Sequence, residues 1–160
     1  MFALLLLLVP SWAWTQDVSG SITVKGKEME LRHAYAFEID SASDPGYLDV
    51  LVVLTSRPIT AEQALDREEL ERLSFKEGLA GIRLLLDPDC TPRGLATYHP
   101  SFTVFLDGAG EHRWQPSAFD ERVAGRLSTP GRQEALGQKW EFDVEFSALI
   151  QLDPEATTVP

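Results

Sequence analysis

The sequence predicts a mainly β protein, an antiparallel β-sandwich with one helical crossover between two of its strands. Apolar and polar residues alternate over most of the chain, which is the period of a strand with one covered face. Gly, Pro and Asp recur between these segments at intervals of about 8–12 residues, as in sandwiches and barrels. Only one segment carries helix-capping signals. A closed β-barrel of the ligand-holding type is the alternative fold for this pattern.

Three strands are predicted before the helix. The first covers residues 21–25 and turns at Gly26-Lys27. The second is a long alternation over 28–40, with one apolar face and one wet face. Residues 48–55 are apolar on both faces, so this third strand is expected at the centre of a sheet, covered on both sides. The face of the second strand that is expected to be buried carries Met29, Leu31, His33, Tyr35, Phe37 and Ile39.

The helical segment is predicted to begin at Thr60. Thr60-x-x-Gln63 is a capping-box pattern, and Asp66-x-x-Glu69 offers a second start. Gly78 fits a C-terminal stop, because glycine adopts the left-handed conformation that ends many helices. The residues expected to be buried are Leu65, Leu70 and Leu73.

Strands return after the helix. Residues 82–86 alternate, and so do residues 95–99 and 102–106. Asp107-Gly108 is a hairpin signal, so residues 112–114 are expected to pair back against 102–106.

The end of the chain shows the clearest strand pattern. A short strand over 123–127 comes first, followed by a long alternation over 140–150. One face of that alternation is apolar and is expected in the core, whereas the other carries acidic residues and serine. The apolar face holds Trp140, Phe142, Val144, Phe146, Ala148 and Ile150, and the polar face holds Glu141, Asp143, Glu145 and Ser147.

The first residues indicate export. Phe2 to Val9 form an apolar run too short to span a bilayer, and Ser11-Trp12-Ala13 resembles a signal-peptidase site. Residues 1–13 are therefore predicted as a signal peptide, and residues 14–160 as one domain that begins at Trp14. Met1 to Ala3 carry no Lys or Arg, so either this leader is unusual or the start lies upstream. The absence of Asn and the excess of Arg over Lys favour a high-GC bacterium, with the protein in the periplasm or outside the cell.

The charge balance limits the partners that we expect. The chain has 25 acidic and 14 basic residues and a formal net charge of −11. Nucleic acid and anionic lipid surfaces are disfavoured, because both bind basic proteins. No stretch is apolar enough for a membrane span. The one cysteine, Cys90, excludes a disulfide framework within the chain, but it could join two molecules in a disulfide dimer.

Two passages carry a family resemblance. Residues 20–27 and 31–36, with Gly125-Arg-Leu and Trp140 to Ala148 near the other end, resemble small exported bacterial β-rich proteins of unknown function. The resemblance implies export and a β-rich domain, and it supplies no activity and no catalytic residues.

Motifs with a defined chemistry are missing from the sequence. It has no G-x-S-x-G, H-E-x-x-H, P-loop, G-x-G-x-x-G or C-x-x-C pattern. No catalytic residue and no cofactor are therefore assigned. Asp87 and Asp89 flank Pro88 in one turn and are the candidates for a metal site, although turns favour Asp for local hydrogen bonding as well.

The remaining candidates are single side chains. His33 lies on an apolar face, where a histidine is usually a hydrogen-bonded core residue. Phe105 lies on the strand face opposite Phe102 and, if exposed, would form a binding patch. Packing in the core is the alternative for Phe105.

Three functions are compatible with these features. The first is an exported, non-catalytic module that binds a protein of the cell envelope or outside the cell through a sheet face or edge. The alternative is a β-barrel carrier of a small apolar ligand. The third is a hydrolase whose residues are dispersed along the chain, which would show titratable groups gathered in a cleft.

Overall fold

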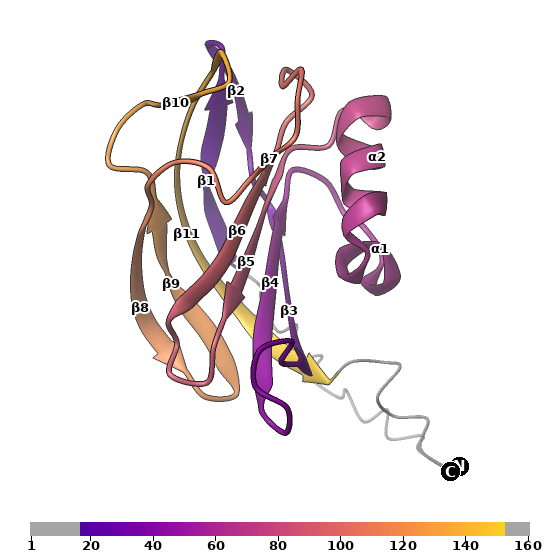
Figure 1. The fold of residues 1–160 in the computed structure, drawn as a ribbon, viewed down its shortest axis with the longest axis vertical. Coiled ribbons are helices and arrows are strands. Elements are labelled where there is room, and N and C mark those ends of the chain that lie inside the picture. The colour runs from indigo at the N-terminus through magenta and orange to yellow at the C-terminus, as the bar shows by residue number, and fades with distance from the viewer. Residues whose placement is uncertain (1–16, 153–160) are drawn as a thin grey trace, which may run out of the picture.

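Two β-sheets pack face to face and share one long strand, and two helices cover the outside of one sheet (Figure 1). This computed structural model describes residues 17–152. The expected leader 1–13 and the expected mature start at Trp14 lie outside the described residues. Within residues 17–152, no helix is both long and apolar enough to cross a membrane.

Sheet A has the strand order β2-β1-β11-β9-β8, and sheet B has the order β3-β4-β5-β6-β7. The shared strand is β11, which pairs with β1 and β9 and then runs beside β3 over its last residues. The β11–β3 pairing is parallel, and all other pairings are antiparallel. The strands are β1 (Asp17–Val24), β2 (Lys27–Glu30), β3 (His33–Asp40), β4 (Leu48–Thr55), β5 (Gly81–Leu86), β6 (Pro92–Tyr98), β7 (Leu106–Asp107), β8 (Arg113–Phe119), β9 (Arg122–Ser128), β10 (Gln133–Ala135) and β11 (Gln138–Leu152).

This arrangement confirms the prediction of a mainly β sandwich and contradicts the alternative of a closed β-barrel. The sheets end at open edges formed by β2, β7 and β8, so the fold is not a closed barrel. The helical crossover connects β4 to β5, which are neighbours in sheet B.

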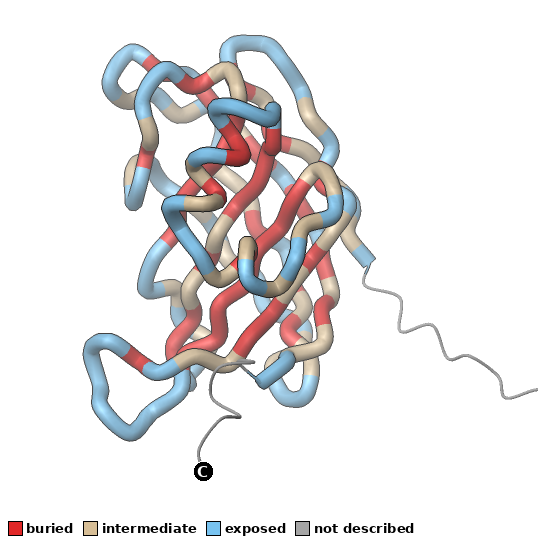
Figure 2. Tube along the Cα trace, turned by 90° about the vertical axis from the view of Figure 1, so that its right-hand side faces the viewer, coloured by how far each residue is buried: buried red, intermediate tan, exposed pale blue. Residues whose placement is uncertain are grey.

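The main core lies between the two sheets. Alternate residues of β11 point into it, as the sequence pattern predicts, and they meet the inner faces of β4 and β5. Figure 2 shows the buried strands at the centre of the molecule and the exposed loops around them. The aromatic part of this core consists of Phe102, Trp140, Phe142 and Phe146.

A second core lies between sheet B and the helices α1 (Ala61–Leu65) and α2 (Arg67–Glu77). Leu70 and Leu73 of α2 pack with Leu51 and Val53 of β4. The other face of β4 belongs to the main core. The prediction of a central strand covered on both sides is therefore confirmed.

The helical segment is two helices rather than one. Thr60 and Gln63 form the expected capping box at the start of α1. Asp66 then adopts an extended conformation, which ends α1, and its side chain accepts a hydrogen bond from the Glu69 N–H at the start of α2. Gly78 ends α2 with a φ of 73°, as predicted.

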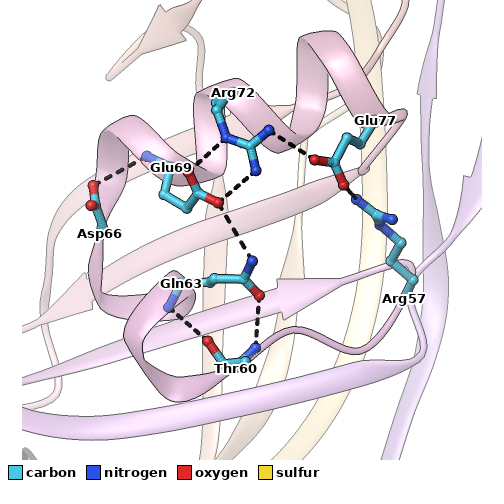
Figure 3. A network of polar contacts seen from close by, with 7 residues as sticks. All are labelled: Arg57, Thr60, Gln63, Asp66, Glu69, Arg72 and Glu77. Carbon is cyan, nitrogen blue, oxygen red and sulfur yellow. Dashed lines mark hydrogen bonds and ion pairs between the residues drawn. The ribbon is translucent and has the colours of Figure 1, made fainter.

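Polar contacts tie the crossover to the end of β4 (Figure 3). The Arg72 guanidinium donates to both Glu69 and Glu77, and Arg57 donates to Glu77 from the chain that follows β4. Hydrogen bonds from Arg72 and Arg57 lower the pKa of Glu69 and of Glu77 respectively. The network is exposed, so we expect it to orient the crossover more than to stabilise it.

The alternation over 28–40 belongs to two strands, contrary to the prediction. The chain leaves β2 after Glu30 and enters the other sheet as β3 at His33. Ala34 and Ala36 are fully buried between the sheets, so the face expected to be wet is covered. Because alanine is small and only weakly apolar, Ala34 and Ala36 do not mark their face as buried in the sequence pattern. The sequence therefore does not indicate that β3 is covered on both sides.

The predicted hairpin at Asp107-Gly108 is also absent. β7 consists of two residues that pair with β6. The chain then crosses to sheet A, where β8 pairs with β9. Val104 is 40% exposed and does not share the buried face of Phe102 and Leu106.

Candidate binding surface

The outer face of sheet A carries carboxylates and hydroxyls in neighbouring rows. In the register of β1 and β11, Asp17 lies opposite Ser147 and Ser19 lies opposite Glu145. The intervening residues of both strands point into the core, so these side chains point outward. We call the following set the acidic face: Asp17, Ser19, Ser21, Thr23, Glu28, Glu30, Glu141, Asp143, Glu145 and Ser147.

A hollow of about 570 Å³ opens on this face. Its lining residues come from β1, β8, β9 and β11 and from Arg32, which lies between β2 and β3. The pairing of distant segments therefore creates the hollow. Hydroxyl and carboxylate oxygens around the hollow can accept hydrogen bonds from a cationic or hydroxylated group. The polar lining comprises Asp17, Ser19, Arg32, Ser117, Glu145 and Ser147.

One Arg–Asp pair lies on the same outer face of sheet A. Arg126 on β9 makes a two-point contact with Asp143, with an Nε–Oδ1 distance of 2.8 Å. Its hydrogen bond lowers the pKa of Asp143. Among residues 17–152, neither Asp17 nor Glu145 has an ion-pair partner. Glu145 nevertheless lies opposite Arg126 in the strand register and interacts electrostatically with its guanidinium. Both carboxylates can still accept hydrogen bonds from a ligand.

Asp87, one of the two metal candidates, closes its own turn. Its Oδ1 accepts hydrogen bonds from the N–H groups of Asp89 and Thr91, at 3.0 and 2.9 Å. Its Oδ2 accepts one from Arg93 at 2.8 Å. The Thr91 hydrogen bond is the main cause of the lowered pKa of Asp87. Asp89 is exposed, and residues 17–152 contain no group of three or more His, Cys, Asp or Glu that could hold a metal.

Phe105, the candidate binding patch, lies beside the helices. Its ring centroid is 5.3 Å from that of Tyr98, and the Arg67 guanidinium carbon lies 5.1 Å from the Phe105 centroid. Arg67 also pairs with Asp107 at 2.7 Å. Phe105 is half-buried and packs against the second core, so part of its ring is covered.

Cys90 is half-buried in the turn after β5. Its side chain packs against the main core. Burial raises the pKa of the thiol, while a contact with Trp114 acts in the opposite direction. The Trp114 indole N–H also donates to the Cys90 carbonyl oxygen at 3.2 Å. A raised pKa leaves less of the reactive thiolate at neutral pH.

The histidines occupy three separate structural positions. His33 is half-buried at the start of β3 rather than in the core, and His112 is half-buried before β8. His99 is fully buried, and its Nδ1 accepts a hydrogen bond from the Ser101 N–H at 3.0 Å. Burial lowers the pKa of His99 to about 4 despite its contact with the Lys27 backbone, and its Nε2 has no partner of good hydrogen-bond geometry.

No family model, curated protein or solved structure matches this chain. The acidic face was not predicted as one surface, because it depends on β1 lying beside β11, more than a hundred residues apart in sequence. The sequence contains one signal of this face. Glu141, Asp143 and Glu145 occupy alternate positions, which aligns three carboxylates on one side of a strand.

Proposed function

We propose that this protein is an exported, non-catalytic module that binds a protein of the cell envelope or outside the cell through its acidic face. The observation that carries the proposal is the hollow on this face, which exposes the carboxylates of Asp17 and Glu145. Neither makes an ion pair within residues 17–152, because Arg126, which lies opposite Glu145, pairs with Asp143 instead. The partner segment is expected to present Lys or Arg, since complementary charge steers and orients protein association. The export part rests on the leader-like residues 1–13.

Binding fits the surface better than catalysis does. Within residues 17–152, the pKa of Tyr98 is raised to about 12 and the pKa of His99 is lowered to about 4. Burial in the two cores is the main cause in both cases. Neither side chain lines the hollow, whereas a hydrolase would gather groups with displaced pKa values at its active site.

An apolar carrier of the barrel type does not fit this fold. It depends on the closed barrel, and the sheets of this protein have open edges. The space between the sheets is filled by core side chains, among them Trp140, Phe142 and Phe146.

Crosslinking in the producing cell tests the proposal. A photo-crosslinking amino acid replaces Ser19 at the hollow in the full chain, and a matched variant carries it at exposed Glu68 on α2. We expect one protein adduct from the Ser19 position, located outside the cytoplasm and suppressed at about 0.5 M salt because screening weakens charge contacts. Equal adducts from both positions, no adduct, or a cytoplasmic chain would each contradict the proposal.

A further inference from the structure

A second hollow lies at one end of the sandwich, between two tight turns. Lys25-Gly26 joins β1 to β2, and Leu136-Gly137 joins β10 to β11. All four residues have positive φ, as two-residue hairpin turns require. The Lys25 N–H donates to the Lys139 carbonyl at 3.0 Å, and both turns lie at the top of Figure 1. The turns are thus held side by side.

The hollow between these turns measures about 280 Å³ and is lined by three cationic side chains, Lys25, Arg132 and Lys139. Lys25 and Arg132 have no ion-pair partner within residues 17–152, and the Lys139 ammonium lies 3.8 Å from a Glu134 oxygen. Glu141 is the one acidic side chain in the lining. The lining therefore carries a net charge of +2, from three cations and one anion.

This local charge opposes the charge of the whole molecule. The chain has a formal net charge of −11 and four lysines, of which Lys25, Lys27 and Lys139 lie at these two turns. At physiological salt, charges more than about 8 Å away are largely screened. A ligand at the turns therefore responds mainly to the cations beside it.

We propose that this hollow binds a phosphate group. Arginine and lysine side chains are the usual protein ligands of phosphate, and a hollow of about 280 Å³ accommodates one phosphoryl group rather than a long chain. Free phosphate and the headgroup of an anionic lipid offer the same chemistry. Leu136 is 77% exposed at the adjacent turn and would be buried by a membrane surface but not by free phosphate.

The first test is a titration of the full chain with inorganic phosphate. The amide NMR signals of Gly26 and Lys139 report the binding. Sodium chloride at matched ionic strength is the control. We expect saturable shifts with phosphate and none with chloride. The Lys25→Gln, Arg132→Gln double variant should bind about three- to fivefold more weakly or worse, because two exposed charge contacts are lost. Glu141→Gln should bind more tightly, and Lys76→Gln on α2 should be unchanged.

The second test separates the two sources. Sedimentation with phosphatidylcholine vesicles is compared with sedimentation with vesicles that also contain phosphatidylglycerol. Binding to the anionic vesicles that falls with the double variant and with Leu136→Ser assigns the site to a lipid headgroup. Saturable phosphate shifts without vesicle binding assign it to a free phosphate or a soluble phosphate ester. The inference is overturned if neither probe binds, or if the double variant binds both probes as the parent does.

Discussion

The indole of Trp114 stacks on the ring of Phe146, with centroids 5.6 Å apart and planes inclined by 18°. The two residues belong to β8 and β11, and β9 lies between these strands. Phe146 pairs with Gly125 of β9, whereas Trp114 pairs with Leu127. The indole therefore crosses Gly125 diagonally to reach Phe146. A Cβ at Gly125 would lie only 2.7 Å from the Trp114 ring and 2.5 Å from the Gln115 carbonyl oxygen.

Gly125→Ala should therefore destabilise the protein. We expect a loss of about 1–3 kcal/mol in the free energy of unfolding, because the methyl group overpacks a full site. The variant should also change the near-UV circular dichroism, since the Trp114–Phe146 stack must open. Gly94→Ala is the control, because a Cβ there meets only Leu85 Cβ at 3.9 Å. Equal urea midpoints for both variants would show that the indole does not depend on Gly125.

The two faces of β11 should respond differently to truncation. Phe142→Ala and Phe146→Ala remove buried rings and should each cost about 3–5 kcal/mol in the free energy of unfolding. Glu141→Ala and Glu145→Ala act on the outer face and should cost well under about 1 kcal/mol. Urea denaturation of the four variants measures this difference. Similar costs on the two faces would mean that sheet A is covered on both sides.

Elements whose signals are local were predictable from the sequence. The alternation of β11, the capping box at Thr60, the second cap at Asp66 and the stop at Gly78 all appear as expected. In each case the residues that carry the signal lie within one strand or a few helical turns. Their structure therefore depends little on which distant segment they contact.

The choice between partner strands was not predictable. The alternation around β2 and β3 does not show that the chain changes sheets at Arg32, and the Asp107-Gly108 signal does not show that β8 pairs with β9. Pairing depends on distant registers that one sequence does not reveal. The same limit applies to both hollows, because each is lined by segments that are far apart along the chain.

Stability should fall as the pH decreases from 7 to 5, in part because of His99. Its pKa is about 4 in the folded protein, against about 6.5 for an unfolded histidine. Between these two pH values the unfolded chain binds more protons than the folded protein. The contribution of His99 to the free energy of unfolding is therefore complete above about pH 6.5 and declines toward pH 4. For this residue we expect a loss of about 1–2 kcal/mol between pH 7 and pH 5.

His99→Gln isolates this effect, since an amide oxygen can still accept the Ser101 N–H. The quantity to compare is the difference in unfolding free energy between pH 7 and pH 5, which should shrink in the variant. His112→Gln serves as the companion variant, because burial lowers the pKa of His112 too. The lowered pKa values of Asp87 and Asp143 matter only at more acidic pH. An unchanged pH dependence in His99→Gln would contradict the prediction.

Cys90 should react slowly in the folded protein. Its side chain packs against the main core, and burial raises the thiol pKa. We expect a thiol-reactive probe to label the native protein at least about tenfold more slowly than the urea-unfolded protein at pH 7. A disulfide dimer through Cys90 remains a prediction. For the same reason, we expect it to form slowly when no reductant is present. Equal labelling rates, or rapid dimer formation that Cys90→Ser abolishes, would show that the thiol is at the surface.

Charge reversal at the hollow on the acidic face tests the proposed binding function most directly. Glu145→Lys changes an exposed carboxylate of the hollow, and Glu68→Lys makes the same change on α2. The measurement is the yield of the adduct formed from the photo-crosslinker at position 19 in cells that make equal amounts of each variant. We expect Glu145→Lys to abolish the adduct and Glu68→Lys to preserve it. An adduct that survives Glu145→Lys, or that both reversals remove equally, would contradict binding through the acidic face.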